Sequence, residues 1–176
     1  GTGLATRVQF FPGAEGCERD SMSTTVIIDT DPGVDDYIAI LLALNSPGLA
    51  LRGLTATGGN ASLSDATTNA LHTLEVAGRT DIPVAIGADS ALNGPFVHAE
   101  GFHGPSGLSI TPPPPAIAPV EQTAVDWLFD RLATSGSPVT VIALGPLTNI
   151  ARLFQERPAA GNRIHRLVVM GGAVDC

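Results

Sequence analysis

Cysteine, basic residues and long apolar runs are all scarce in this chain of 176 residues. The two cysteines, Cys17 and Cys176, lie near opposite ends, so they form neither a disulfide framework nor a thiolate metal site, and a cytoplasmic location is expected. The net charge of -8 argues against nucleic acid or an anionic membrane as a partner. No apolar run reaches the roughly 20 residues that a membrane-spanning helix needs. A small polar ligand or a metal ion suits this balance better.

Apolar residues are plentiful by contrast, at 44% of the chain against 15% charged residues, which is the composition of a folded globular protein. The length suits one domain with a sizeable core. Residues 1–21 show neither a helical nor a strand period and lack the apolar segment of a signal peptide. We expect them to be an extension, disordered or not native to the domain, in front of a domain that spans residues 22–176.

Short β-branched segments alternate with longer amphipathic ones from residue 25 onward. Strands are predicted at 25–29, 49–57, 83–86, 139–144 and 166–170, and helices at 35–44, 64–77, 121–133 and 147–154. In the first helix Ile38, Leu41 and Leu42 share a face, and its near-uniform apolarity predicts that it is largely buried. The alternation predicts an α/β fold with a doubly wound, mainly parallel, Rossmann-like sheet.

Four unusual loops directly follow predicted strands, at residues 29–36, 58–60, 145–146 and 171–172. In parallel sheets of this kind, ligands bind beyond the carboxyl ends of the strands. A further stretch, residues 87–119, is rich in Gly and Pro, and a loop of this length in a compact domain is usually functional or disordered. The site is therefore expected at the edge of the sheet where the four loops converge.

The first of these loops, residues 29–36, carries four carboxylates, on Asp29, Asp31, Asp35 and Asp36. Carboxylates at this density repel one another unless a cation compensates, and hard oxygen ligands suit Ca²⁺ or Mg²⁺. The alternative is that Asp35 and Asp36 only cap the following helix. Capping accounts for one or two of the carboxylates, so we favour a divalent-cation site.

The same eight residues match, without a gap, the signature Asp-x-Asp-Pro-Gly-x-Asp-Asp, and in this respect the chain resembles the inosine-uridine-preferring nucleoside hydrolases. Further segments resemble that family in the expected order: Thr57 to Asn60, Phe102 to Gly107, Leu144 to Asn149 and Val169 to Gly172. The resemblance covers about residues 25–174. A combination of motifs in this order is far more specific than any one of them.

The resemblance implies a Ca²⁺ cofactor and a ribonucleoside substrate. Ca²⁺ would be held by Asp31, Asp36 and the backbone carbonyl of Leu144, and Asp31 would also be the catalytic base that activates the attacking water. Asp35 and Asn60 would bind ribose hydroxyls or support the residues that do. Met170 would pack beside the sugar, and His103 would lie near the nucleobase.

Four of these assignments have a plainer alternative. Asn60 could be a turn residue and His103 a merely exposed side chain. The Leu144-Gly145-Pro146 turn could serve only to start a helix, and Met170 could be a core residue of a buried strand.

Members of the family continue well beyond the segment that resembles Val169 to Gly172. They then supply a Glu-Phe-Asn segment that binds ribose and a His-Asp pair whose Asp completes the metal shell, whereas this chain stops at Cys176. The resemblance therefore implies the N-terminal half of a Ca²⁺-dependent hydrolase of nucleoside catabolism and salvage, which cleaves ribonucleosides to free base and ribose. The chain looks truncated at its C-terminus, as a fragment or a short protein, and we expect impaired activity from it alone.

Two other functions stay open at this stage. A non-enzymatic fragment would bind a cation or sugar weakly, or serve in an interaction. A phosphatase of the haloacid-dehalogenase type would use the Asp29-Thr30-Asp31 segment, but that family expects Gly-Thr or a similar pair after the second Asp, and Lys and acidic motifs later. No motif indicates the preferred nucleobase, and a monomer and a homo-oligomer are both compatible with the sequence.

Overall fold

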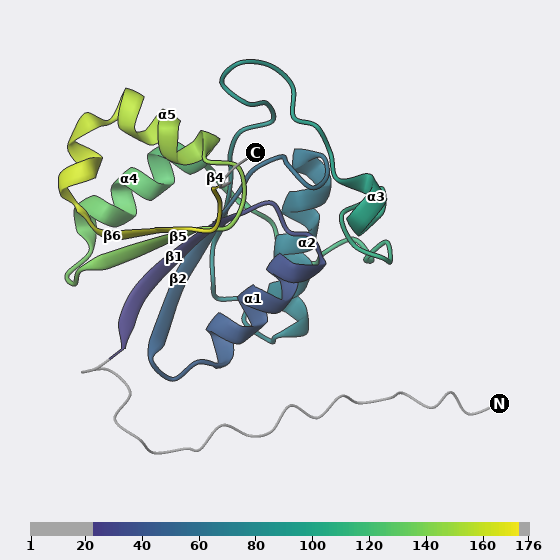
Figure 1. The fold of residues 1–176 in the computed structure, drawn as a ribbon. Coiled ribbons are helices and arrows are strands. Elements are labelled where there is room, and N and C mark those ends of the chain that lie inside the picture. Colours follow the sequence, from purple (N-terminus) through teal and green to yellow (C-terminus); the bar gives the residue numbers. More distant parts are fainter. Residues whose placement is uncertain (1–22, 173–176) are drawn as a thin grey trace.

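Six strands form one parallel sheet in the order β4-β3-β2-β1-β5-β6 (Figure 1). The computed structural model describes residues 23–172, so Cys17, Cys176 and the predicted extension of residues 1–21 lie outside the described residues. The strands are β1 (Thr24–Thr30), β2 (Leu49–Ala56), β3 (Val84–Ile86), β4 (Val120–Thr123), β5 (Val139–Ala143) and β6 (Ile164–Val169). The helices are α1 (Val34–Asn45), α2 (Leu63–Val76), α3 (Glu100–His103), α4 (Ala124–Thr134), α5 (Thr148–Glu156) and the 3-10 helix η1 (Pro158–Asn162).

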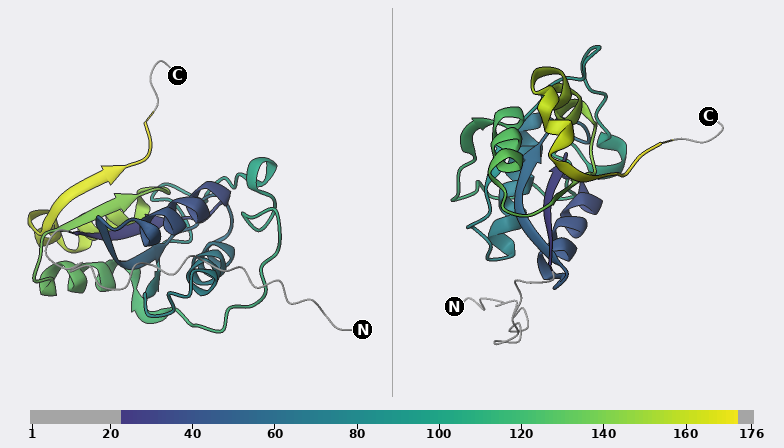
Figure 2. Two further views of the ribbon diagram at one scale, coloured as in Figure 1. Left: turned by 90° about the horizontal axis from the view of Figure 1, so that it is seen from below. Right: turned by 90° about the vertical axis from the view of Figure 1, so that its left-hand side faces the viewer.

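Helices cover both faces of the sheet, which confirms the predicted doubly wound α/β fold (Figures 1 and 2). Successive residues of a strand point to opposite faces, so β1 sends Val26 and Ile28 into the core beneath α1 and α2, and Ile27 into the core beneath α4 and α5. The largest buried side chain, Trp127 of α4, lies against Gly53 of β2, where a Cβ atom would collide with the indole ring. The β-branched runs seen in the sequence are thus buried on both sides, as parallel strands generally are.

The order of the strands places a topological switch point at β1. From β1 the chain proceeds outward through β2, β3 and β4, and then returns to place β5 on the other side of β1. Ligands bind at such points because the loops after the two central strands diverge to opposite faces and leave a crevice. The loops concerned here are residues 31–33 after β1 and residues 144–147 after β5.

The buried face of α1 is not the one that the sequence predicted. Ile38 is 60% exposed and Leu42 is 67% exposed, whereas Asp36, Ile40 and Ala43 are buried. These three residues are spaced i, i+4 and i+7, so they form one helical face that rests on the sheet. The prediction was wrong because α1 is apolar nearly all round, and periodicity then does not single out one face. The actual face turns Asp36 inward.

The boundary of the predicted helix 121–133 also differs. Residues 121–123 belong to the edge strand β4, which pairs with β3, and α4 begins only at Ala124. The hydroxyl of Thr123 accepts a hydrogen bond from the backbone N–H of Asp126 at 3.2 Å and so caps the helix. The strand predicted at 166–170 runs from Ile164 to Val169, and the long loop contains the short helix α3.

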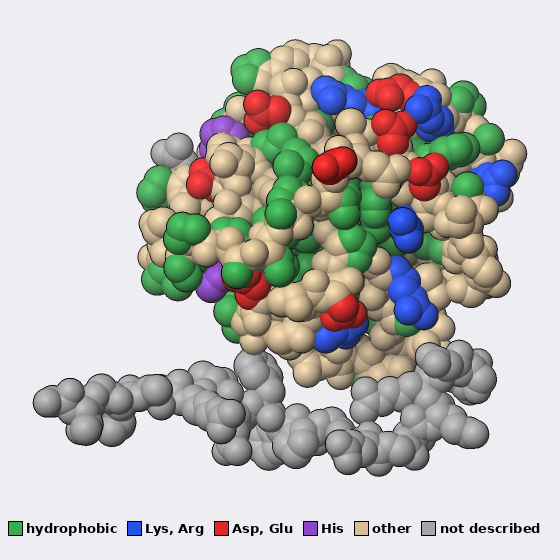
Figure 3. Space-filling view, turned by 180° about the vertical axis from the view of Figure 1, so that it is seen from behind, with side chains coloured by type: hydrophobic (Ala, Val, Ile, Leu, Met, Phe, Trp, Pro, Cys, Tyr) green, Lys and Arg blue, Asp and Glu red, His purple; other side chains and the backbone are tan. Residues whose placement is uncertain are grey.

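None of the helices within residues 23–172 has the length and apolarity to cross a bilayer. On the face that Figure 3 turns to the viewer, arginine and acidic side chains are interspersed with apolar ones. That face therefore presents no large basic patch of the kind that binds nucleic acid.

Candidate functional site

The acidic loop, residues 29–36, lies at the switch point and leads from β1 into α1. Asp36 is at the start of the buried face of α1, and its carboxylate accepts hydrogen bonds from the Thr30 hydroxyl at 2.7 Å and from the backbone N–H of Gly33 at 3.3 Å. The second bond caps the helix, so the capping alternative holds for Asp36. It does not account for Asp31, which makes no such bond to α1.

Asp31 occupies a space that two glycines leave open. Its side chain is 4% exposed and lies between Gly59, in the loop after β2, and Gly145, in the loop after β5. A Cβ atom on either glycine would collide with the carboxylate. Three of the four predicted loops therefore meet at this one side chain, which is what the convergence of strand ends predicts.

Asn60 connects the two carboxylates. Its backbone N–H donates to Asp31 Oδ2 at 2.6 Å, and its Nδ2 donates to the Asp31 carbonyl at 3.2 Å and to Asp36 Oδ2 at 3.3 Å. A residue with this many contacts to the acidic loop is more than the plain turn residue of the alternative interpretation. The structure thus brings together Asp31, Asp36 and Asn60, as the sequence predicted for a shared site.

Leu144 lies beside the same group. Its backbone N–H donates to the Asp29 carbonyl at 2.8 Å, which extends the pairing of β5 with β1 by one residue. The next residue, Gly145, is the one that contacts Asp31. The backbone of Leu144 is therefore held close to the acidic loop. Leu144 is also part of the connection that leads to α5.

Asp29 is separated from the others by complete burial. Its exposed fraction is 0%, and its Oδ1 accepts hydrogen bonds from the Thr55 hydroxyl and from Asn149 Nδ2, the latter at 2.8 Å. Asn149 also accepts a bond from the Ala88 N–H at 2.8 Å and donates to the Ala56 carbonyl at 3.2 Å. One amide therefore ties together the ends of β1 and β2, the loop after β3 and the start of α5.

No sequence pattern predicted these partners of Asn149. It stands in the segment Leu144 to Asn149 that carries the family resemblance, but its partners are far away along the chain. Complete burial of Asp29 also removes it as a nucleophile for phosphate esters, which argues against the haloacid-dehalogenase alternative.

Burial raises the pKa of all three inward-facing carboxyl groups. The pKa of Asp31 rises to about 7, chiefly through desolvation, with a hydrogen bond from Asn60 opposing the rise and the nearby charge of Asp36 adding to it. The pKa of Asp29 rises to about 6 through desolvation, against the bonds from Thr55 and Asn149. The pKa of Asp36 is also raised, first by desolvation. Negative charge at this site is thus costly unless a cation compensates.

The oxygen atoms present suit a hard divalent cation such as Ca²⁺. They are the two carboxylates of Asp31 and Asp36 and the main-chain carbonyls of the loops, and Asp29 Oδ2 is a buried oxygen that lacks a hydrogen-bond partner within the described residues. Residues 23–172 nevertheless contain no group of three or more His, Cys, Asp or Glu side chains placed to hold a metal ion. The donor set fits Ca²⁺ in kind, and it supplies two carboxylates rather than three.

The remaining predicted site residues are not part of the cluster formed by Asp31, Asp36 and Asn60. Asp35 is exposed on the outer side of α1, and Met170 follows β6 with 55% of its surface exposed, which contradicts the core alternative for that side chain. The side chain of His103, at the end of α3, lies outside what the structure describes. Another histidine, His98, places Nδ1 3.0 Å from the Gly59 carbonyl, and no sequence pattern had singled it out.

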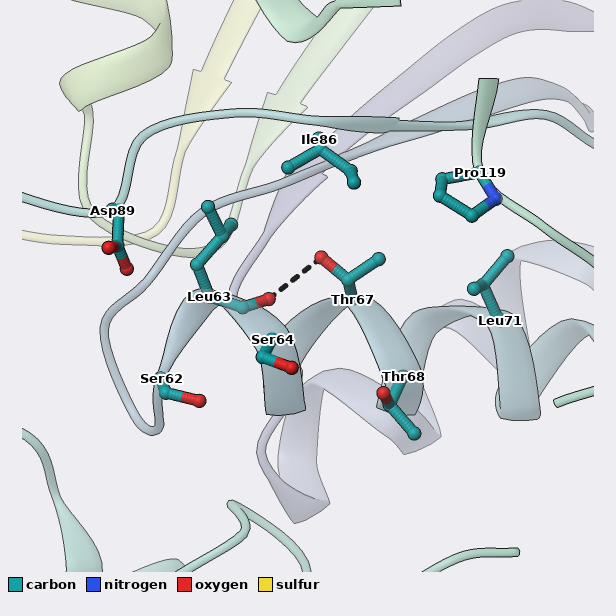
Figure 4. A pocket seen from close by; sticks show the side chains of 9 residues that line it. All are labelled: Ser62, Leu63, Ser64, Thr67, Thr68, Leu71, Ile86, Asp89 and Pro119. Carbon is teal, nitrogen blue, oxygen red and sulfur yellow. Dashed lines mark hydrogen bonds between the residues drawn. The ribbon is translucent and has the colours of Figure 1, made fainter. Parts of the chain in front are cut away.

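A cavity of about 580 Å³ opens between α2 and the end of β3 (Figure 4). Hydroxyl side chains of α2 and its cap line one side of it, among them Ser62, Ser64, Thr67 and Thr68, and Asp89 lies at one end. The Thr67 hydroxyl is already bonded to the Leu63 carbonyl at 2.7 Å. No predicted site residue lines this cavity, so it does not mark the acidic site.

Comparison with known proteins identifies the family. The model of the family described as inosine-uridine preferring nucleoside hydrolase matches residues 26–176. The chain is 44% identical over 151 residues to a protein from Oryza sativa subsp. japonica named probable uridine nucleosidase 2, which covers 84% of this chain and 45% of that protein. It is 42% identical over 154 residues to the Escherichia coli pyrimidine-specific ribonucleoside hydrolase RihA, covering 87% of this chain and 50% of that protein.

Solved structures show the same likeness. A plant nucleoside hydrolase, PpNRh1, superimposes with a TM-score of 0.81 at 40% identity, over 85% of this chain and 48% of that chain. A purine-preferring ribonucleoside hydrolase from Gardnerella vaginalis superimposes with a TM-score of 0.81 at 30% identity, over 86% of this chain and 50% of that chain. The chain thus spans about half the length of the relatives it matches.

Proposed function

The chain belongs to the inosine-uridine preferring nucleoside hydrolase family, and from that membership we propose that its acidic site binds Ca²⁺ and serves the hydrolysis of the N-glycosidic bond of ribonucleosides. The observation that carries the proposal is the meeting of Asp31, Asp36 and Asn60 at the switch point of the sheet. These residues belong to the motifs through which the chain resembles the family.

Asp31 and Asp36 would hold Ca²⁺ together with the Leu144 carbonyl. A Ca²⁺ ion at this place supplies positive charge, which lowers the pKa of a nearby water molecule and of the carboxyl groups around it. Asp31 is suited to accept a proton from the attacking water, because bound Ca²⁺ would keep its carboxylate ionised although burial raises its pKa in the metal-free protein. Asn60 keeps the Asp31 carboxylate in one orientation through the 2.6 Å bond.

The substrate would enter from the exposed side of the acidic loop. Asp35 and Asn60 would bind the ribose hydroxyls, Met170 would lie beside the sugar and His103 toward the nucleobase. Cleavage of the N-glycosidic bond gives the ribose oxocarbenium character, and the fixed negative charge of the acidic loop stabilises that positive charge.

The isolated chain is proposed to be a weak catalyst, because residues 23–172 supply only two carboxylates to the cation and Ca²⁺ affinity depends on the number of charged ligands. The edge strand β6 supports this proposal. Its residues Leu167, Val168 and Val169 are each at least 37% exposed. Consecutive apolar residues of this kind are typical of strands covered on both faces, so β6 lacks the cover that its composition implies. The second candidate, a non-enzymatic fragment that binds a cation or sugar, is favoured by the same two observations.

The proposal is tested by calorimetric titration with Ca²⁺ and by measuring the release of ribose from uridine and inosine. We expect Asp31→Asn to weaken Ca²⁺ binding by about 100-fold, since it removes one of two charged ligands without changing the shape of the side chain. Asp89→Asn is the matched control: this carboxylate follows β3 on the same edge of the sheet but does not contact the acidic loop, so Ca²⁺ affinity should not change.

Three results would separate the candidates. Failure of the unaltered chain to bind Ca²⁺ at millimolar concentration contradicts the metal site. Binding without detectable hydrolysis favours the non-enzymatic candidate. Ribose release at an ordinary enzymatic rate, about 10 s⁻¹, contradicts the proposal of weak activity.

A further inference from the structure

Asn69, in the middle of α2, contacts two loops that are distant from each other in the sequence. Its side chain is 1% exposed, and its Nδ2 donates one hydrogen bond to the Pro32 carbonyl at 2.9 Å and another to the Ser106 carbonyl at 2.8 Å. Pro32 belongs to the acidic loop and directly follows Asp31. Ser106 belongs to the 103–107 segment, which contains His103.

Gly107 completes this junction. Its φ angle is +80°, and a Cβ atom at this position would lie 3.1 Å from the Pro32 carbonyl oxygen and 3.2 Å from Asn69 Nδ2. A side chain is therefore disfavoured here both by the backbone conformation and by the lack of space. The 103–107 segment and the acidic loop thus pack directly against each other, and the Asn69 amide lies at their contact.

The bonds of Asn69 are made at a cost. Its Oδ1 is buried without a hydrogen-bond partner among the described residues, and leaving such an atom unpaired is destabilising. An apolar side chain would fill the space beneath the loops without that cost, but would leave the two loop carbonyls unpaired. The amide therefore contributes something that simple packing of α2 does not need, which is a fixed arrangement of two loops.

We propose that Asn69 is a positioning residue that couples the acidic loop to the 103–107 segment. The inference rests on the proposed function of the acidic loop as a Ca²⁺ site. Occupation of that site holds Pro32 and its carbonyl in one arrangement, and Asn69 transmits this order to the segment that faces the nucleobase. By linkage the effect is reciprocal, so order in the 103–107 segment strengthens Ca²⁺ binding.

Amide hydrogen exchange of the full 176-residue chain, with Ca²⁺ or with a chelator, tests the coupling. In the unaltered chain, Ca²⁺ should slow exchange of the backbone amides at residues 104–110, among them the Gly107 N–H that donates to the Gly104 carbonyl. In Asn69→Asp, which keeps the shape of the side chain but loses both N–H donors, exchange at these amides should be about tenfold faster without Ca²⁺ and should no longer respond to it.

Two further variants make the test specific. Gly107→Ala perturbs the same junction from the loop side and should give the same result, which covers the case in which Asn69→Asp fails to fold. Thr73→Val is the matched control, because Thr73 is buried one turn further along α2 and its hydroxyl, within residues 23–172, bonds only to the Asn69 main-chain carbonyl at 2.7 Å. It should exchange and respond to Ca²⁺ like the unaltered chain.

The proposal is overturned if Asn69→Asp and Gly107→Ala leave exchange at residues 104–110 unchanged in the metal-free protein, or if both variants keep a normal response to Ca²⁺. The metal-free comparison does not depend on Ca²⁺ binding or hydrolysis. A chain that binds no Ca²⁺ but shows faster local exchange in both variants would contradict the proposed metal site while supporting the junction at Asn69.

Discussion

At the scale of single residues, the dominant feature is a carboxylate held where burial opposes its ionisation. Asp31 is enclosed by Gly59, Gly145 and the Asn60 main chain, and its pKa rises to about 7. In the folded, metal-free protein this group therefore keeps a proton that the unfolded chain releases near pH 4. Its contribution to stability is fully present below about pH 4 and is lost as the pH rises toward 7.

The consequence is a pH-dependent effect of Ca²⁺ on thermal unfolding. We expect the Tm of the metal-free protein to fall between pH 5 and pH 8, because Asp31 and Asp29 ionise within the fold. Ca²⁺ binds the ionised form, so it should raise the Tm more at pH 8 than at pH 5. Thermal unfolding followed by circular dichroism, with Ca²⁺ or EDTA, measures both effects.

Asp31→Asn provides the control for this pH dependence. The variant carries no titrating group at that position, so its metal-free Tm should vary less with pH and respond less to Ca²⁺. A metal-free Tm that increases steadily from pH 5 to pH 8 would contradict the raised pKa values.

At the scale of the elements, α1 decides which carboxylates face the site. The buried face contains Asp36, Ile40 and Ala43, and Asp35, the residue before Asp36 in the same first turn, lies on the outside. If the face around Ile38 and Leu42 had been buried instead, the helix would be rotated and Asp36 would point away from Asn60. The orientation of α1 therefore determines which carboxylates belong to the site.

Two isoleucines of α1 provide a matched pair for testing this orientation. Ile40 is 0% exposed and Ile38 is 60% exposed. Ile40→Ala should lower the free energy of unfolding by about 3 kcal/mol through the cavity that it leaves. Ile38→Ala should change it by less than about 1 kcal/mol. Urea unfolding of both variants measures the difference, and equal or reversed effects would show that the helix packs by another face.

At the scale of the whole molecule, the two edge strands of the sheet differ in composition. The strand β4, at one edge, consists largely of polar residues, whereas β6 ends the other edge with three consecutive apolar residues. Exposed edge strands of this kind offer unpaired backbone groups and apolar surface to another chain. The β6 edge is therefore the surface through which we expect this chain to associate.

Self-association through β6 should therefore be sensitive to charge. Val168 is 43% exposed, and Val168→Lys should leave the chain folded while reducing its concentration-dependent association, as measured by analytical ultracentrifugation. Val141, on the neighbouring strand β5, is 0% exposed, so Val141→Lys should abolish folding because it buries a charge. If Val168→Lys associates like the unaltered chain, another surface is responsible.

Much of the fold and the centre of the site follow from the sequence alone. The β-branched runs and amphipathic segments predicted the parallel sheet because strands buried on both faces need apolar residues at every position, which is a local property. The carboxylates of Asp31 and Asp36 could be placed together because the turn between them is short. Asn60 was assigned by the family resemblance, and its loop was expected at the same edge because the carboxyl ends of neighbouring parallel strands meet there.

Only the tertiary structure decided the rest. The buried face of α1 depends on which side the sheet covers, and an almost uniformly apolar helix does not encode that choice. The roles of Asn69 and Asn149 depend on partners brought near only by the fold, since Ser106 and Asp29 are remote from them in the sequence. The sequence therefore determined which chemical groups this protein holds at the ends of its strands. The packing of helices and loops determined how these groups are oriented, because hydrogen bonds between distant segments form only once the chain is folded.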